Sequence, residues 1–150
     1  MKPIPFFKLQ AKNLYRDYKT KKPYIDTVDG ETYFDYSPTY FDVDRILLEY
    51  DWNEEKFSLM NAQHTIALMV GFRKWSDMLK ASDEELELAK LLFDNQDKIG
   101  IEDWQMYVAG VENDNNTELS SQSMLEIFKL VFVDVDGHYN PFGDYRLNRN

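Results

Sequence analysis

The chain contains no cysteine and only two histidines among its 150 residues. Without cysteine it can form no disulfide, no thiolate nucleophile and no cysteine-ligated zinc site. The two histidines, His64 and His138, lie far apart in the sequence. No Glu-x-x-His pair, glycine-rich phosphate loop or serine nucleophile elbow occurs. We therefore expect no catalytic residues, no bound metal and no cofactor.

Long apolar runs are also missing. No stretch approaches the ~20 apolar residues that span a bilayer. The first ten residues, MKPIPFFKLQ, lack the sustained apolar region of a signal peptide. The composition therefore predicts a cytoplasmic protein without a membrane-spanning segment. Hydrophobic residues still make up 43% of the chain, which is enough to bury a core, and its length favours a single domain over residues 1–150.

Basic residues are scarce and unevenly distributed. The chain has 17 lysines and arginines against 27 acids, for a net charge of −10. Residues 1–22 hold seven of the bases and a single acid, Asp17. A basic segment on an acidic body indicates either a surface for a partner or a helix that pairs with its own body. The sequence leaves both alternatives open.

The clearest structural signal lies in residues 58–81, SLMNAQHTIALMVGFRKWSDMLKA. Apolar residues recur there at intervals of three and four, and Gly71 follows the last of them, where a helix closes in a left-handed residue. We predict a helix, a tight turn and a second helix, with Ile66, Val70, Phe72, Trp75 and Leu79 facing inward together. The residues that define this corner are Gln63, Ile66, Ala67, Gly71, Phe72, Trp75 and Leu79.

The pattern AQ-x-x-IA-x-x-x-GF-x-x-W-x-x-x-L, which runs from Ala62 to Leu79, resembles a helical hairpin of small bacterial domains of unknown function. A similar hairpin stands near the start of some ankyrin-repeat and glyoxalase-superfamily proteins. The run ELELAKLLF, at residues 85–93, continues in the manner of the small bacterial domains. The resemblance implies a bacterial protein with this hairpin, and because it rests on packing residues it transfers no activity.

Turn and cap residues suggest the remaining elements. Pro3 and Pro5 predict an extended start before a helix over residues 6–19. Asp29-Gly30 predicts a two-residue turn that places Ile25 opposite Phe34 in a hairpin with one face packed on helices. Further helices are expected at residues 43–50 with Asp42 as N-cap, 82–93 with a Ser82–Glu85 capping box, 101–111, and 121–133 with Ser121 as cap.

The predicted fold is mainly α, with about six helices and one small N-terminal β-hairpin. A basic helix occupies residues 1–22, the hairpin residues 24–36, a helical core residues 42–133 and a turn-rich tail residues 136–150. Residues 127–135 are rich in β-branched and aromatic side chains. The alternative is therefore an α+β fold in which a C-terminal strand joins the hairpin.

An acidic, aromatic segment carries the leading functional hypothesis. Residues 24–55 contain ten acids and one base, Arg45, together with many tyrosines. Tyrosine is favoured at protein interfaces, and carboxylates attract basic partners. We expect a non-catalytic intracellular interaction domain that binds a protein partner of basic character. The residues expected to form its binding face are Tyr33, Asp35, Tyr36, Tyr40, Asp42 and Asp44.

A DNA-binding helix-turn-helix is the first alternative. Gln63, Ala67 and Gly71 match the Gln-x-x-x-Ala-x-x-x-Gly pattern of that family. The resemblance implies that a second helix presents Arg73, Lys74 and Lys80 to DNA. The net charge of −10 opposes binding to phosphates, so nucleic acid is not the expected partner.

A metal-dependent phosphatase is the second alternative. The run LVFVDVDG, residues 130–137, resembles motif I of haloacid-dehalogenase-type phosphatases. The resemblance implies a strand that presents Asp134 as nucleophile and Asp136 as acid beside Mg²⁺. Only thirteen residues follow Gly137, which leaves no room for the later catalytic residues of that family.

Overall fold

The computed structural model describes residues 1–147. Within them the chain forms seven α-helices, a π-helical turn and a two-stranded antiparallel sheet. The mainly helical fold with one small N-terminal hairpin is confirmed. The elements are α1 (Pro3–Tyr18), β1 (Lys22–Ile25), β2 (Thr32–Asp35), α2 (Val43–Glu49), α3 (Leu59–Met69), α4 (Trp75–Leu79), α5 (Asp83–Asp94), α6 (Ile101–Asn115), α7 (Ser121–Phe128) and the π-helix η1 (Lys129–Val133).

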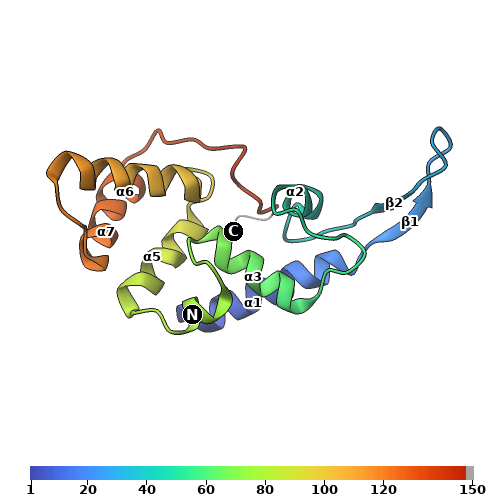
Figure 1. The fold of residues 1–150 in the computed structure, drawn as a ribbon, viewed down its shortest axis with the longest axis horizontal. Helices are drawn as coiled ribbons and strands as arrows, with labels where there is room; N and C mark the ends of the chain where they lie inside the picture. Colours follow the sequence, from blue (N-terminus) through green and yellow to red (C-terminus); the bar gives the residue numbers. More distant parts are fainter. Residues whose placement is uncertain (148–150) are drawn as a thin grey trace.

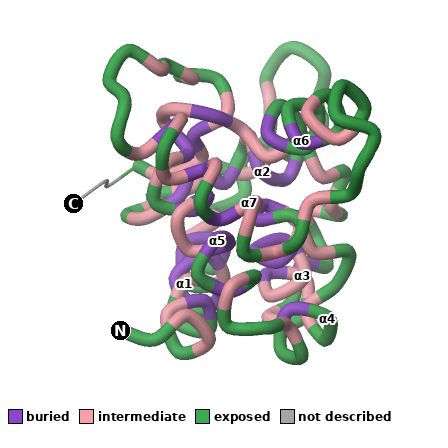
Figure 2. The backbone as a smooth tube through the Cα atoms, turned by 90° about the vertical axis from the view of Figure 1, so that its left-hand side faces the viewer, coloured by how far each residue is buried: buried purple, intermediate pink, exposed green. Residues whose placement is uncertain are grey.

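The helices form an elongated body with the hairpin at one end. Helix α1 packs along α3 and also contacts α5, while α5 packs against α7. Helices α6 and α7 lie at the end opposite the hairpin (Figure 1). Figure 2 shows buried segments of α1, α3 and α5 gathered in the interior. Within residues 1–147, no helix combines the length and the apolarity needed to cross a bilayer.

Helix α1 begins earlier than predicted. The expectation that Pro3 and Pro5 stay extended is wrong, because the helix starts at Pro3. Proline is tolerated in the first helical turn, where backbone N–H groups have no partner within the helix. Its apolar face is buried and consists of Phe7, Ala11, Leu14 and Tyr18.

The helical corner forms around Gly71, as predicted. Gly71 has a φ of +95°, and the Phe72 N–H donates to the Ala67 carbonyl at 3.0 Å. Ile66 and Ala67 are fully buried, and Phe72 and Trp75 pack against the core.

The inward placement of Leu79 is wrong. Leu79 is 44% exposed, and Met78 is buried in its place. Helix α4 begins only at Trp75. Phe72 and Leu79 are seven residues apart, but Phe72 lies in the turn before α4, so the two residues do not belong to one face of a helix.

Cap signals identified several helix starts. The Asp42 side chain accepts the Arg45 N–H, and Ser82 and Glu85 form the expected reciprocal capping box. The choice of Ser121 as a cap is wrong by one position, because Ser120 accepts the Ser123 N–H at 3.1 Å.

The strand alternative for residues 127–135 is also wrong. Helix α7 continues into η1 through this segment. The rings of Phe128 and Phe132 lie 5.0 and 5.9 Å from the Trp104 ring. Their spacing of four residues brings both rings to one helix face, so this contact with α6 favours helix over the local preference for strand.

The hairpin differs from its prediction in register and in packing. Ile25 pairs with Thr32, and Phe34 pairs with Pro23. A two-residue turn of the expected type requires positive φ at both Asp29 and Gly30, whereas only Gly30 has it. Six residues, 26–31, connect the two strands, and a bond from the Gly30 N–H to the Asp26 carbonyl at 3.0 Å closes the turn within them.

Neither strand of the hairpin packs closely on a helix. Both strands are exposed apart from Phe34, which is half-buried. The hairpin reaches away from the helical body (Figure 1). The expectation that one face of the hairpin packs on helices is therefore wrong.

One buried carboxylate joins α1 to the chain that follows the hairpin. Asp17 is 1% exposed. Its Oδ1 accepts the Thr39 N–H at 2.9 Å, and its Oδ2 accepts the N–H groups of Tyr40 and Phe41 at 2.7 and 2.8 Å. This contact, here called the Asp17 clip, holds residues 39–41 on α1 and so determines where α2 begins.

The tail returns to the same segment. Phe41 forms an antiparallel bridge with Arg146, and the Leu147 N–H donates to the Tyr40 carbonyl at 2.9 Å. Arg146 forms an ion pair with Asp97 in the α5–α6 connection and another with Asp144 in the tail itself. The predicted turn-rich tail is therefore tied to the body, and residues 148–150 lie outside the described residues.

We expect Asp17→Ala to lower the free energy of unfolding by at least ~3 kcal/mol, because three backbone N–H groups lose a charged acceptor. Denaturant unfolding measures the change. The control is Asp114→Ala, which alters an exposed acid on α6 and should change stability by less than about 0.5 kcal/mol. Equal effects of the two substitutions would show that the clip contributes nothing.

Met78→Ala should cost about 3 kcal/mol of unfolding free energy, since it opens a cavity under α4. Leu79→Ala should cost less than about 1 kcal/mol, because its side chain already contacts solvent. Thermal or denaturant unfolding of this adjacent pair tests the core assignment, and a larger loss for Leu79→Ala would overturn it.

Candidate functional site

Four carboxylates come together where the hairpin meets the helical body. Asp35 ends β2, Asp42 caps α2, Asp44 lies in the first turn of α2, and Glu54 comes from the loop before α3. We call these four residues the acidic face. Within residues 1–147, none of them forms an ion pair. The face therefore gathers like charges without an ion pair, and the nearby Lys21 ammonium donates to the Glu54 backbone carbonyl at 2.9 Å.

The pKa of Asp44 reports this crowding. Partial burial raises it above its ordinary value, and the negative charges of Asp42, Glu54 and Asp35 raise it further. Both causes disfavour the charged form of a carboxyl group. The four carboxylates thus lie within electrostatic range of one another although they come from three separate parts of the chain.

Tyrosines border the acidic face. The Tyr36 hydroxyl donates to Glu54 Oε1 at 2.9 Å, and burial together with this carboxylate raises the pKa of Tyr36. Tyr24 and Tyr33 face each other across the hairpin, with ring centroids 5.9 Å apart. Partial desolvation raises the pKa of Tyr24, as do the charges of Asp35 and several other acids, Asp44 among them. Tyr24 therefore lies within electrostatic range of these acids.

The tip of the hairpin is organised by its own acids. The Tyr33 hydroxyl donates to the Asp29 carboxylate, which lowers the pKa of Asp29 and raises that of Tyr33. Asp29 also accepts the Glu31 N–H at 2.9 Å, and Asp26 accepts the Val28 N–H at 2.7 Å. These bonds hold Tyr33 in place on an exposed strand.

The structure brings together most of the predicted face. Asp35, Asp42, Asp44 and Tyr36 cluster, and Tyr33 lies nearby on the hairpin. Tyr40 does not join them: its side chain packs against the core and its backbone is held by Asp17 and Leu147.

Sequence reasoning missed two members of the site. The period of two along β1 and β2 could have placed Tyr24 beside Tyr33. No local pattern could have found Glu54, because a loop brings it to the face.

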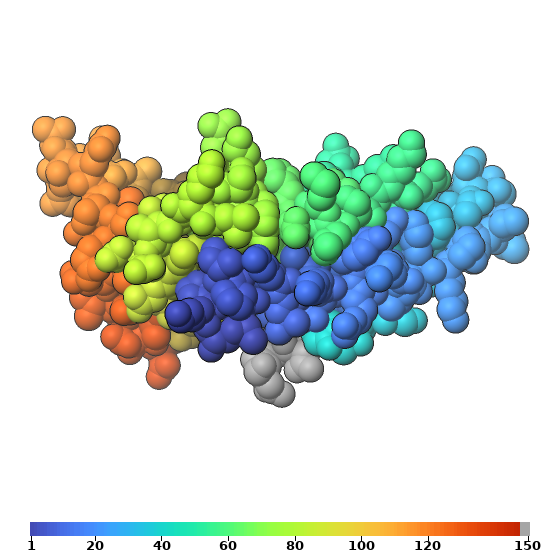
Figure 3. All heavy atoms as spheres, turned by 90° about the horizontal axis from the view of Figure 1, so that it is seen from below, coloured from blue at the N-terminus to red at the C-terminus, as the bar shows by residue number. Residues whose placement is uncertain are grey.

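The basic side of α1 offers a second charged surface. Lys8, Lys12 and Arg16 are exposed on one face of the helix, and α1 forms much of the surface on this side (Figure 3). In the part of the chain that the structure describes, none of these three forms an ion pair. These three side chains therefore make no direct ion pair with the acidic residues of the body, as pairing of this helix with its own body would require.

The helix-turn-helix hypothesis lacks its reading helix. Helix α4 has only five residues, Arg73 and Lys74 precede it, and Lys80 is its C-cap. The expected placement of these three bases on the second helix is wrong. Gln63 is half-buried, and the corner as a whole serves the core.

The phosphatase hypothesis lacks its strand. Asp134 caps the π-helix η1, and Asp136 is exposed beyond it. The expected strand before Asp134 is therefore wrong. His138 Nε2 lies 2.8 Å from the Val131 carbonyl, and its ring packs on Phe132. Within residues 1–147, no three histidine, aspartate or glutamate side chains converge as metal ligands.

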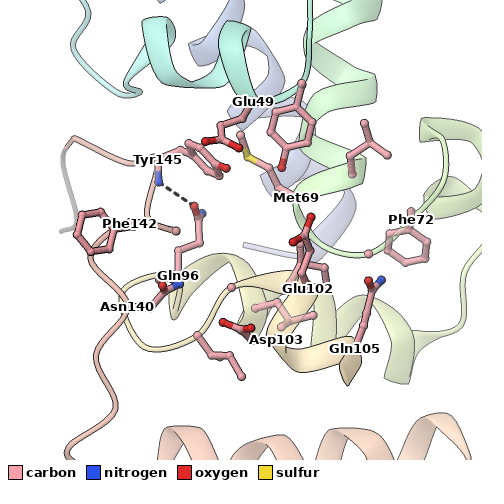
Figure 4. A pocket seen from close by; sticks show the side chains of 18 of the residues that line it. Glu49, Met69, Phe72, Gln96, Glu102, Asp103, Gln105, Asn140, Phe142 and Tyr145 are labelled. Carbon is pink, nitrogen blue, oxygen red and sulfur yellow. Dashed lines mark hydrogen bonds between the residues drawn. The ribbon is translucent and has the colours of Figure 1, made fainter. Parts of the chain in front are cut away.

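A cavity of about 570 Å³ lies between the end of α2, the α3–α4 turn, the start of α6 and the tail. Figure 4 shows Glu49 and Tyr145 on one side of it and Glu102, Asp103 and Gln105 on another. The Tyr145 N–H donates to Gln96 Oε1 at 3.2 Å. Around this cavity we find no pairing of a nucleophile with a base among residues 1–147, and the predicted site residues other than Gly71 and Phe72 lie elsewhere.

Comparison with known proteins adds no relative: no protein-family model, no curated protein and no solved structure matches the chain. The resemblance to small bacterial domains therefore stays a prediction.

Asp44→Asn should stabilise the protein at pH 7 by about 0.5 kcal/mol, the scale of an exposed charge interaction. Because the native pKa of Asp44 is raised, the native state holds this proton more tightly than the unfolded state does. Protonated Asp44 thus contributes its full stabilisation below pH 3.8, the ordinary pKa of the group. This stabilisation is lost as the pH rises through the higher pKa of the native state.

Denaturant unfolding of Asp44→Asn and of the unmodified protein at pH 3 and pH 7 tests this sign. The difference between them should move in favour of the variant as pH rises. Asp114→Asn, far from the acidic face, should show no such trend. A variant that loses more stability at pH 7 than at pH 3 would contradict the crowding of the four carboxylates.

Proposed function

We propose that the protein is a non-catalytic interaction module that binds a basic segment of a protein partner through its acidic face and the adjoining tyrosines. The observation that supports it most is the convergence of Asp35, Asp42, Asp44 and Glu54 without an ion pair. Partial burial and then the neighbouring like charges raise the pKa of Asp44, and both act against folding when the group is charged. A cationic partner would relieve this repulsion on binding.

The chemistry of the surface suits a protein ligand. Carboxylates that gather on one face attract a cationic partner and orient it during its approach. Tyr24 and Tyr33 add flat rings that carry hydroxyl groups, and such side chains combine apolar contact with hydrogen bonding at interfaces. The absence of cysteine fits a reducing compartment such as the cytoplasm.

The proposal also gives the uneven charge a role. The exposed bases of α1 are not used up in ion pairs with described acids, so the molecule presents an acidic surface and a basic one. A basic partner is drawn to the first and repelled by the second. Charge placement would therefore select both the partner and its orientation.

The double variant Asp35→Lys/Asp44→Lys should bind a fluorescent oligolysine peptide at least ~10-fold more weakly than the unmodified protein, because each reversal replaces an attraction with a repulsion. Asp42 is left in place because it caps α2. Fluorescence anisotropy over a series of salt concentrations measures the affinity.

The matched control is Asp114→Lys/Glu118→Lys, which changes the net charge equally at exposed positions near the end of α6, away from the hairpin (Figure 1). It should weaken binding much less. Equal losses in the two variants would mean that the peptide senses only net charge, and the acidic face would no longer be a binding site.

A further inference from the structure

The exposed hairpin leaves two sheet edges open. Val28 in its loop is 93% exposed, and Ile25 on β1 is 70% exposed. A two-stranded hairpin has marginal stability alone and is normally stabilised by a third strand or a helix. Here the body provides little cover beyond the Lys21 ammonium, which lies 4.6 Å from the centroid of the Phe34 ring.

The pairing register decides which backbone groups point outward. The Asp26 N–H donates to the Glu31 carbonyl at 2.9 Å, and Tyr24 lies opposite Tyr33. In an antiparallel ladder, pairs that exchange hydrogen bonds alternate with pairs that do not. Tyr24–Tyr33 is thus a bonded pair. On β2, the backbone groups of Thr32 and Phe34 therefore point away from β1.

The two edges are not equivalent. On β1 the outward positions are Pro23 and Ile25, and proline has no N–H to offer to an incoming strand. On β2 both outward residues, Thr32 and Phe34, keep their N–H and carbonyl groups. No backbone bond from elsewhere in residues 1–147 reaches these groups. The edge of β2 therefore offers two backbone donors to another strand, whereas the edge of β1 offers one.

Charge indicates what can pair there. The hairpin carries Asp26, Asp29, Glu31 and Asp35 against a single base, Lys22. Two copies brought edge to edge would place these acids together, so a second copy of the chain is disfavoured. A basic segment is favoured.

Alternation along β2 specifies this segment further. Tyr33 and Asp35 share the side of the hairpin that Tyr24 occupies, whereas Thr32 and Phe34 share the other side. Side chains of an added strand would lie beside these residues in turn. Bases would be favoured next to Asp35, and β-branched or apolar residues next to Thr32 and Phe34.

We propose that the outer edge of β2 accepts an extended segment of a basic partner as a third strand, in which basic and apolar residues alternate. This inference rests on the proposed function and specifies how its partner is held. Backbone hydrogen bonds would supply general affinity, and the alternating side chains would supply specificity.

The first experiment follows amide hydrogen exchange by NMR. In the protein alone, the Thr32 and Phe34 amides should exchange faster than the Tyr33 amide, which is paired to β1. A capped peptide of alternating lysine and valine should slow exchange at Thr32 and Phe34 by about tenfold or more. A peptide of alternating glutamate and valine is the matched control and should leave their exchange unchanged.

The second experiment removes the edge donor. Thr32→Pro deletes an outward N–H without breaking a bond to β1, and should weaken binding of the lysine–valine peptide at least ~5-fold. Ile25→Pro makes the equivalent change on the edge of β1 and should leave affinity unchanged. Exchange at Tyr33 verifies that the hairpin persists in each variant, and the exchange experiment on the unmodified protein does not depend on either.

Any of three results would overturn the third strand. In the first, the lysine–valine peptide shows no saturable binding up to about 1 mM. In the second, it binds without changing amide exchange at Thr32 and Phe34. In the third, protection of these amides increases with protein concentration in the absence of peptide, which would indicate a second copy of the chain. If affinity still depends on Asp35 and Asp44 while the edge stays unprotected, the proposed function survives and the third strand does not. If that dependence is absent as well, both fail.

Discussion

The Asp17 clip is the contact on which the arrangement of the N-terminal half depends. A single carboxylate on α1 accepts three consecutive backbone N–H groups from residues 39–41. Those residues also receive the tail, through the bridge from Phe41 to Arg146. One buried charge, satisfied by backbone donors, thus joins α1, the return from the hairpin and the C-terminal segment. Asp42 and Asp44 follow directly, so the clip also positions the acidic face.

The chain uses its carboxylates in two contrasting ways. Asp17 is buried and accepts three backbone N–H groups, which stabilises the fold. Asp35, Asp42, Asp44 and Glu54 gather at a surface without an ion pair, and partial burial together with the neighbouring charges raises the pKa of Asp44. The first arrangement is what folding favours. The second opposes folding, which is why we connect it with binding.

Sequence patterns predicted correctly those features that depend on interactions between residues close together in the chain. The caps at Asp42 and Ser82 were predicted because a side chain and an N–H three residues on suffice to form them. The prediction that Leu79 lies in the core was wrong. The apolar spacing from Phe72 to Leu79 was taken as one helical face, but it crosses the turn before α4, and Met78 is the residue that points inward. The strand alternative for residues 127–135 failed because Phe128 and Phe132 pack together on Trp104, a contact that local preference cannot report.

The amino-acid sequence was enough to predict a mainly helical fold, a corner at Gly71, and a concentration of acids and tyrosines between residues 24 and 55. Each of these follows from spacing, from backbone conformation or from composition. Three other features became visible only in three dimensions: the hairpin stands away from the body, Glu54 joins Asp35 and Asp44, and Tyr40 turns to the core. Those outcomes depend on contacts between residues distant in the chain, chiefly the anchoring of residues 39–41 by Asp17, and no short pattern encodes them.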